Sequence, residues 1–282
     1  MSKKIIVTGC NGQLGHAVND FYAGSDYECV NTDVGELDIT DVDAVLKFAR
    51  EVKPYAIINC AAYTNVNMCE TEKDLSFRIN AIGPRNLAIA ASETGSKLVQ
   101  ISTDYVFPGD EDKELTEFDK TGPVSSYGFG KLAGENFVKD FADKYFIIRT
   151  AWLYGEGKNF VRTMLNAAKT NPSVRVVRDQ IGNPTSAVEL AKCIGYLLPT
   201  DNYGLFHGTC EGSCSWADFT EEFYRLAGVT TPVERITTDE FPTPTKRPAF
   251  SKLDNYMLRQ TTDFRFAHWT DAIAEYMRNE QK

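Results

Sequence analysis

The sequence lacks any long hydrophobic run. None of its apolar stretches approaches the ~20 residues that a membrane-spanning helix needs. The first residues lead directly into a predicted strand rather than into a signal-peptide pattern. We therefore expect a cytoplasmic protein with no membrane partner.

Basic residues are also scarce. The chain has 30 Lys and Arg against 39 Asp and Glu, a formal net charge of -9. This balance argues against a general surface for nucleic acid or for anionic membranes. A phosphorylated ligand would therefore have to be held by local cations and backbone amides.

The cysteines do not form a metal or disulfide pattern. There are seven, an odd number, and they are scattered along the 282 residues. Neither close pair, Cys60 with Cys69 or Cys210 with Cys214, has the Cys-x-x-Cys form of a zinc or redox site. The sequence thus predicts reduced thiols and no metal. The chain is long enough to bury a hydrophobic core without disulfide or metal cross-links.

Three glycines follow the first predicted strand, residues 4–8. Their spacing, Gly-x-x-Gly-x-x-Gly, is a variant of the dinucleotide-binding fingerprint, and a helical pattern begins directly after it. In that motif the glycines let the backbone approach a pyrophosphate at a helix N-terminus. The cofactor-binding residues predicted here are Gly9, Asn11, Gly12, Gln13, Leu14 and Gly15.

Asp33 follows the second predicted strand, residues 28–32. A carboxylate at this place can accept hydrogen bonds from an adenosine ribose and would repel a 2′-phosphate. No Arg or Lys lies between Lys4 and Lys47 to receive such a phosphate. The local pattern therefore favours NADH, and the alternative is that Asp33 only caps the next turn.

Further strands are predicted at residues 55–59, 97–101 and 145–150, alternating with helices. This alternation is typical of an α/β protein with a Rossmann-type, doubly wound parallel sheet. After Thr150 the rhythm changes, and we predict helices at 159–169 and 187–198, a strand at 174–177, and a strand at 205–207 that returns to the sheet. The rest is predicted to be mostly loop. We expect a dinucleotide-binding domain of residues 1–150 plus about 186–208, and a smaller C-terminal substrate-binding lobe of about 151–185 and 209–282.

Tyr127 and Lys131 lie four residues apart, which on a helix puts both on one face about 5.4 Å apart. A phenol beside an ammonium suits proton donation to a carbonyl oxygen as hydride arrives from a nicotinamide. We expect Lys131 to lower the pKa of Tyr127 and to reach the nicotinamide ribose. Thr103, at the end of the fourth strand, would hydrogen-bond the substrate oxygen. The alternative is an ordinary solvated helix face.

Two glycines flank Phe129 within this helix. Gly128 and Gly130 each cost roughly 1 kcal/mol of helix preference relative to alanine. We therefore expect a soft helix start that holds Lys131 loosely before the cofactor binds.

These motifs together resemble the short-chain dehydrogenase/reductase superfamily, its extended sugar-nucleotide branch, and within it the dTDP-4-dehydrorhamnose reductase family. The resemblance covers nearly the whole chain. It rests on residues 61–66, the Ser-Thr-Asp-Tyr-Val-Phe segment 102–107, residues 127–135 and 149–155, Asp179-Gln180 with Gly182 and 184–185, and Arg247-Pro248 with Ser251 and Leu253.

The resemblance implies reduction of the 4-keto group of dTDP-4-dehydro-L-rhamnose, with Thr103, Tyr127 and Lys131 as catalytic residues. Sugar dehydratases of this branch carry an acid after the Thr-Asp pair, whereas this chain has Tyr105. The implied substrate-binding residues are Tyr63, Thr64, Thr103, Asp104, Tyr105, Trp152 and Arg247, although Trp152 could equally be lobe core and Arg247 a surface ion pair.

The family accepts NADPH as well as NADH, which opposes the inference from Asp33. The implied cofactor-binding set adds Asp33, Asp38, Ile39, Ala61, Ala62, Tyr63, Asn80, Tyr127 and Lys131 to the glycine turn. Some members form a metal-bridged dimer through a glutamate in the first helix, and the matching position here is Ala17. We therefore expect a monomer or a weak homodimer.

Asn80 matches a superfamily asparagine that helps a water chain reach the active-site lysine. Pro84 has no N–H to bond the carbonyl of Asn80. We expect that carbonyl to be free for the water.

Two other functions stay open. One is a reductase or epimerase acting on another nucleotide sugar. The other is a non-catalytic binding subunit, as in the regulatory subunit of methionine adenosyltransferase, against which the intact Thr103, Tyr127 and Lys131 argue.

Overall fold

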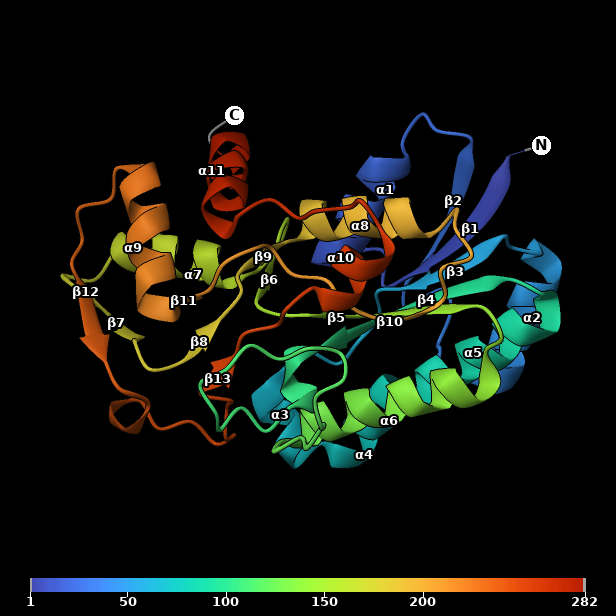
Figure 1. Cartoon of the computed structure of the whole chain (residues 1–282), viewed down its shortest axis with the longest axis horizontal. Coiled ribbons are helices and arrows are strands. Elements are labelled where there is room, and N and C mark those ends of the chain that lie inside the picture. The colour runs from blue at the N-terminus through green and yellow to red at the C-terminus, as the bar shows by residue number, and fades with distance from the viewer. Residues whose placement is uncertain (1, 281–282) are drawn as a thin grey trace.

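A six-stranded parallel sheet forms the centre of the molecule (Figure 1), as seen in a computed structural model that describes residues 2–280. The strand order is β10-β5-β4-β3-β1-β2, and every neighbouring pair is parallel. The predicted Rossmann-type α/β fold is confirmed, including the late strand that returns to the sheet. The strands are β1 Lys3–Thr8, β2 Tyr27–Thr32, β3 Ala56–Asn59, β4 Lys97–Thr103, β5 Tyr145–Thr150 and β10 Gly204–His207.

Helices cover both faces of this sheet, which explains the apolar runs at residues 5–7 of β1 and 56–58 of β3. In β1, Ile5 and Val7 belong to a cluster with helices α1 (Gln13–Tyr22) and α8 (Ala187–Leu197). The alternate residue Ile6 belongs to a second cluster with α2 (Val42–Val52), α5 (Gly83–Thr94) and α6 (Ser126–Phe141). Figure 1 shows the first two helices above the sheet and the other three below it.

The segment from 66 to 94 is a broken series of helices. It consists of α3 (Val66–Thr71), α4 (Lys73–Phe77), a π-helical turn at Arg78–Ile82, and α5. Within the wide turn, the Gly83 N–H donates to the Arg78 carbonyl, and Pro84 follows without an N–H of its own. The turn packs on α6, because a Cβ placed on Gly134 would lie 2.4 Å from the Asn80 carbonyl oxygen.

The C-terminal part forms a smaller lobe at the left of Figure 1. Its strands are short: β7 (Val174–Val177) pairs with β12 (Val233–Ile236), and β8 (Ile181–Gly182) pairs with β11 (Cys214–Ser215) and β13 (Phe250–Ser251). A further pair joins β6 (Leu153–Tyr154) and β9 (Thr185–Ser186). The helices of the C-terminal part are α7 (Phe160–Ala168), α9 (Trp216–Ala227), α10 (Tyr256–Thr261) and α11 (Trp269–Glu280), and 3-10 turns lie at Asp104–Val106 and Thr238–Glu240.

The expectation that the chain after residue 207 is mostly loop was wrong for α9 and α11, which have 12 residues each. Ser215 and Asp218 form a capping box at the start of α9. Phe219 and Phe223, four residues apart, then bury one face of that helix. By contrast, the proline-rich piece 241–248 contains neither helix nor strand, as expected.

All seven cysteines are free thiols. Within residues 2–280, no helix combines the length and the apolar character that crossing a bilayer would need.

Candidate active site

A cleft of about 940 Å³ opens at the carboxyl ends of β1, β3 and β4 and reaches the lobe. Most of the predicted site residues line it, which confirms that the fold brings them together. Those lining it are Gly9, Asn11, Gly12, Gln13, Leu14, Asp33, Asp38, Ile39, Ala61, Ala62, Thr64, Thr103, Asp104, Tyr105, Tyr127, Lys131 and Trp152. Four predicted site residues do not line the cleft: Gly15, Tyr63, Asn80 and Arg247.

The glycine turn is built for close contact with a ligand. Gly9 has a φ of +62°, and a Cβ there would lie 2.7 Å from the backbone of Ala61. A Cβ on Gly15 would lie 2.5 Å from the carbonyl oxygens of Gly9 and Cys10, so Gly15 serves the packing of α1 rather than the cleft. Gly12, the N-cap of α1, brings no side chain to cap the first N–H groups. The helix N-terminus is therefore open to a diphosphate.

Asp33 accepts two backbone N–H groups, and its contact with an adenosine ribose stays a prediction. Its Oδ2 accepts the Asn11 N–H at 3.2 Å, which ties it to the glycine turn, while Oδ1 accepts the Val34 N–H at 2.8 Å and caps the local turn. A cation that the local sequence did not reveal lies at the same end of the cleft. Arg78, from the π-helical turn, lines the cleft and donates from Nη2 to the Thr40 hydroxyl at 3.4 Å.

Tyr63 and Asn80 hold one another rather than facing the cleft. The Tyr63 N–H donates to Asn80 Oδ1 at 3.0 Å, and Asn80 Nδ2 donates to the Tyr63 carbonyl at 3.1 Å. The Tyr63 hydroxyl donates to the Glu72 carboxylate. Asn80 therefore supports residues 61–64 from behind. The contacts of Tyr63 and Asn80 with a ligand stay predictions. The contact of the Asn80 carbonyl with water also stays a prediction.

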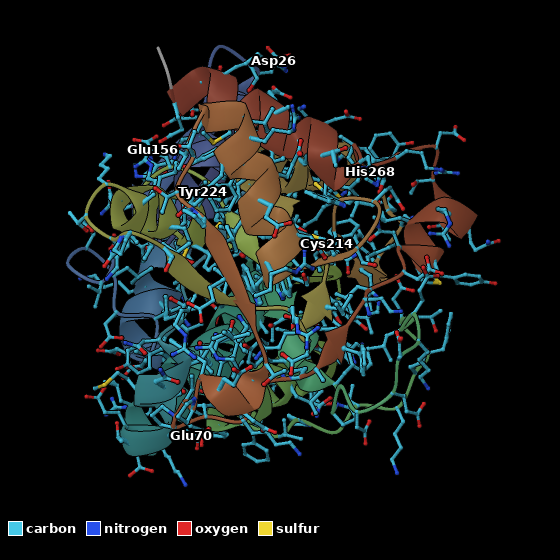
Figure 2. The ribbon with its side chains drawn as sticks, turned by 90° about the vertical axis from the view of Figure 1, so that its left-hand side faces the viewer. Asp26, Glu70, Glu156, Cys214, Tyr224 and His268 are labelled. Carbon is cyan, nitrogen blue, oxygen red and sulfur yellow. The ribbon has the colours of Figure 1, made fainter. Side chains whose placement is uncertain are left out.

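Helix α6, which carries Tyr127 and Lys131, starts next to the turn that follows β4. Ser125 caps it by accepting the Gly128 N–H at 3.1 Å, and Glu70 of α3 accepts both the N–H and the hydroxyl of Ser126 at 2.7 Å. Glu70 is labelled near the lower edge of Figure 2. A Cβ on Gly128 would lie 2.2 Å from the Tyr105 carbonyl oxygen. Glycine is thus required for α6 to approach the turn that follows β4, and Tyr127 and Thr103 line the same cleft.

The electrostatics of Tyr127 differ from the expectation. Burial raises the pKa of its phenol above the usual value, and the hydrogen bond with Thr103 only partly opposes that. The expected lowering by Lys131 is not what governs the pKa in this structure, because burial is the larger effect. Tyr127 therefore stays protonated at neutral pH, which is the form that a proton donor needs.

Lys131 is firmly placed, so the expectation of a loosely held side chain was wrong. It is 4% exposed, and Nζ donates to the Ile101 carbonyl at 2.6 Å. Burial lowers the pKa of its ammonium to about 8, while the Glu135 carboxylate acts in the opposite direction. Below that pKa, at neutral pH, the group is charged and still has two donor hydrogens for a ligand.

A buried ion pair that the sequence did not reveal lies beneath Lys131. Arg149 of β5 makes two hydrogen bonds to Glu135 of α6, at 2.8 and 2.7 Å, and both side chains are almost fully buried. Ser102 donates to the same carboxylate at 2.5 Å. This network joins α6 to the carboxyl ends of β4 and β5 and so fixes the strand end that carries Thr103.

Two predicted substrate residues occupy different positions around Tyr127. Tyr105 lies edge-on to the Tyr127 ring, with ring centroids 5.6 Å apart, and burial raises the pKa of Tyr105 to about 12. Arg247 lies beside Tyr105 and opposes that rise, outside the described cleft lining. Its Nε is buried and makes no hydrogen bond within residues 2–280. The contact of Arg247 with a sugar diphosphate stays a prediction.

Stacked tryptophans form the lobe wall of the cleft. Trp152 has a φ of +47° and stacks on Trp216, with ring centroids 3.6 Å apart and planes 8° from parallel. A Cβ on Gly182 would lie 2.6 Å from the Trp152 ring. Trp152 thus packs within the lobe and also lines the cleft, so both roles considered for it agree with its position. Trp216, 64 positions later in the sequence, was not predicted.

The rim beside the glycine turn comes from the segment after β6. Glu156 and Lys158 line the cleft here, and Figure 2, which views the molecule from the lobe, labels Glu156 on this side. Asn159 holds the turn, because its Nδ2 donates to the carbonyls of Gly155 and Gly157 at 2.6 and 3.3 Å. Lys158 was not predicted. Among residues 2–280, the cationic side chains that line the cleft are Arg78, Lys131 and Lys158.

Residues 3–282 match the family described as the RmlD substrate binding domain. The chain belongs to the RmlD family. A crystal structure of a dTDP-4-dehydrorhamnose reductase from Clostridium acetobutylicum is 51% identical with a TM-score of 0.97, covering 99% of this chain and 100% of that one. The same enzyme from Bacillus anthracis, in complex with NADP, is 40% identical with a TM-score of 0.97 and the same coverage. The dTDP-4-dehydrorhamnose reductase of Aggregatibacter actinomycetemcomitans is 36% identical, covering 96% of this chain and 97% of its own length.

Because these similarities span the whole chain, membership of the RmlD family applies to the sheet and to the lobe alike. The arrangement can hold a dinucleotide along the glycine turn, with Tyr127 and Lys131 at the inner end of the cleft and the tryptophan wall opposite. A half-buried phenol that lines the same cleft as a fixed ammonium suits protonation of a carbonyl oxygen.

Proposed function

We propose that the chain is an NAD(P)H-dependent oxidoreductase that reduces the 4-keto group of dTDP-4-dehydro-L-rhamnose to dTDP-L-rhamnose. The observation that carries the proposal is that Thr103, Tyr127 and the buried Lys131 line one cleft together with the glycine turn. The RmlD-family relatives that bear the reductase name support the substrate. This activity would place the chain in dTDP-rhamnose biosynthesis, which supplies a polysaccharide precursor.

Different residues along the cleft have different roles in the reaction. When bound, the nicotinamide cofactor supplies the hydride that reduces the sugar carbon. Tyr127 donates its proton to the 4-keto oxygen, and the Lys131 ammonium stabilises the phenolate that forms and holds the nicotinamide ribose. Thr64, Asp104, Tyr105 and Trp152 are placed to contact the sugar. The open N-terminus of α1 would hold the cofactor diphosphate.

We infer that the site accepts NADPH as well as NADH. Asp33 is placed for the hydroxyls of an adenosine ribose, which suits NADH. Arg78 supplies a cation at the same end of the cleft, which suits a 2′-phosphate. The relative from Bacillus anthracis was solved with NADP.

Kinetics with both cofactors test this inference. Arg78→Ala should raise the KM for NADPH about tenfold and the KM for NADH much less, since a charge-assisted hydrogen bond contributes about 1.5–3 kcal/mol. Arg85→Ala is the matched control, because Arg85 lies over the Phe141 ring outside the described cleft lining. An unchanged KM for NADPH in Arg78→Ala would show that Arg78 does not bind the 2′-phosphate.

Steady-state assays with different nucleotide sugars test the substrate. The chain should oxidise NADPH or NADH fastest with dTDP-4-dehydro-L-rhamnose, and preference for another 4-keto sugar would reassign it within the same reaction class. Epimerisation without net consumption of cofactor would favour an epimerase. No oxidation of either cofactor with any keto sugar, together with tight binding to a partner enzyme, would favour a non-catalytic regulatory subunit.

We further propose that residues 1–150 and about 186–208 bind the dinucleotide, and that residues 151–185 and 209–282 bind the sugar. A cytoplasmic monomer or weak homodimer agrees with the net charge of -9 and the free thiols. Light scattering after gel filtration tests the oligomeric state, and a stable dimer at micromolar concentration would overturn this part.

A further inference from the structure

We propose that Asp104 is a positioning residue that fixes the direction of the Thr103 hydroxyl, so that Thr103 faces the cleft as a hydrogen-bond acceptor. The inference rests on the proposed reductase function. Thr103 ends β4 and Asp104 begins the 3-10 turn that follows, and the two side chains are 5% and 2% exposed. Their contact lies at the inner end of the cleft, where both residues line it.

The hydrogen bonds of Thr103 account for most of what its hydroxyl can do. A threonine hydroxyl has one proton to donate and two lone pairs to accept with. The proton is donated to Asp104 Oδ1 at 2.9 Å, and one lone pair accepts the Tyr105 N–H at 3.2 Å. A single lone pair remains, so toward the cleft Thr103 can only accept a hydrogen bond. The proton order is therefore Thr103 to Asp104.

This order changes the role expected for Thr103. While its proton is held by Asp104, Thr103 cannot donate to the 4-keto oxygen, so Tyr127 is the donor that oxygen meets. Thr103 can instead accept a hydrogen bond from the new hydroxyl of the reduced sugar.

The carboxylate of Asp104 also lies near the lobe. Ser251 on β13 is close enough to lower its pKa. The oxygen that does not meet Thr103, Oδ2, is buried and makes no hydrogen bond within residues 2–280. Ser251 belongs to the lobe, so the direction of the Thr103 hydroxyl depends on how the lobe sits against β4.

The arrangement works only with Asp104 ionised. Burial raises the pKa of Asp104 to about 6, against hydrogen bonds from Ser251, Thr103 and the local backbone that lower it. The titratable groups that face it are Tyr127 and Tyr105, with Arg247 behind Tyr105. Because the active form is the carboxylate, activity should be present above this pKa and lost as the pH falls through it.

The test is the pH profile of kcat in wild type and two variants, with the 4-keto nucleotide sugar that wild type reduces fastest. Wild type should lose kcat below a pH near 6. In Asp104→Asn the amide oxygen still accepts the Thr103 proton but does not titrate, so this acid limb should vanish while at least a tenth of kcat at pH 8 remains. Ser251→Ala should move the limb to higher pH, because it removes a donor to the carboxylate.

A second readout does not depend on turnover. Infrared difference spectra of wild type against Asp104→Asn follow the Asp104 carboxyl as pH is varied, and the Ser251→Ala protein should titrate at higher pH than wild type. This titration tests the positioning even if the reductase function itself fails. An acid limb that persists in Asp104→Asn would overturn the proposal, as would a carboxyl that titrates at the same pH with and without Ser251.

Asp104→Ala separates positioning from sugar binding. Loss of the acceptor should lower kcat by about tenfold or more with the KM for the sugar little changed. A raised KM with kcat unchanged would make Asp104 a sugar-binding residue and overturn the proposal. If Asp104→Ala fails to fold, the pH profiles of Asp104→Asn and Ser251→Ala still test the proposal.

Discussion

The sheet and the lobe are held together in different ways. The sheet strands have four to seven residues, lie between helix layers, and carry an ion pair buried with almost no exposure. The lobe has strands of two to four residues and depends on stacked rings, with Trp216 meeting both Trp152 and Phe160. The proposed reacting groups all stand on the sheet half. The proposed sugar contacts, by contrast, come from both parts, with Thr64, Asp104 and Tyr105 on the sheet half and Trp152 on the lobe.

The largest expected effect concerns stability, and it compares the same substitution in both parts. Glu135→Gln leaves the Arg149 charge buried without its partner and should lower the free energy of unfolding by about 3–5 kcal/mol. In the lobe, Glu221 pairs with Arg235 at 3.1 Å, but about two fifths or more of each side chain is exposed. Glu221→Gln should therefore cost less than about 1 kcal/mol. Urea unfolding curves measure both, and similar losses would show that the ion pairs do not distinguish the two parts.

The next effect concerns catalysis. Tyr127→Phe removes the proton donor and should lower kcat by ~10²-fold or more, while NADPH binding followed by fluorescence stays unchanged. Tyr154→Phe is the matched control in the lobe, since the Tyr154 hydroxyl is buried and makes no hydrogen bond within residues 2–280. Its kcat should stay close to wild type. Near-normal turnover by Tyr127→Phe would remove Tyr127 as the acid.

The sheet half was predictable because its signals are local. Continuous apolar runs between helices mark buried parallel strands, and each of the six observed strands starts within one residue of the predicted start. The spacing of the three glycines predicted the backbone turn that lines the opening of the cleft. The carboxyl ends of parallel strands meet at one edge of the sheet, so Thr103 could be expected beside Tyr127 and Lys131 before any contact was seen.

What the sequence did not reveal depends on contacts between distant segments. Arg78 reaches the cleft only because the chain widens into a π-helical turn, and Trp216 because α9 packs against the segment after β5. Strands of two residues, such as β8 and β11, are too short to show an alternating pattern. The pKa of Tyr127 was misjudged for a related reason, since the burial that raises it comes from several elements at once.

The smallest expected effect tests whether the tryptophan wall serves the sugar alone. Trp216→Leu removes the ring on which Trp152 stacks, and such a pair contributes about 0.5–1.5 kcal/mol beyond the area it buries. The KM for the nucleotide sugar should rise up to about tenfold, with the KM for NADPH and kcat little changed. Trp216→Phe keeps an aromatic face under Trp152 and should recover most of the loss. If the KM for NADPH rises equally, the stack also shapes the cofactor end of the cleft, and the lobe cannot be varied independently of the chemistry.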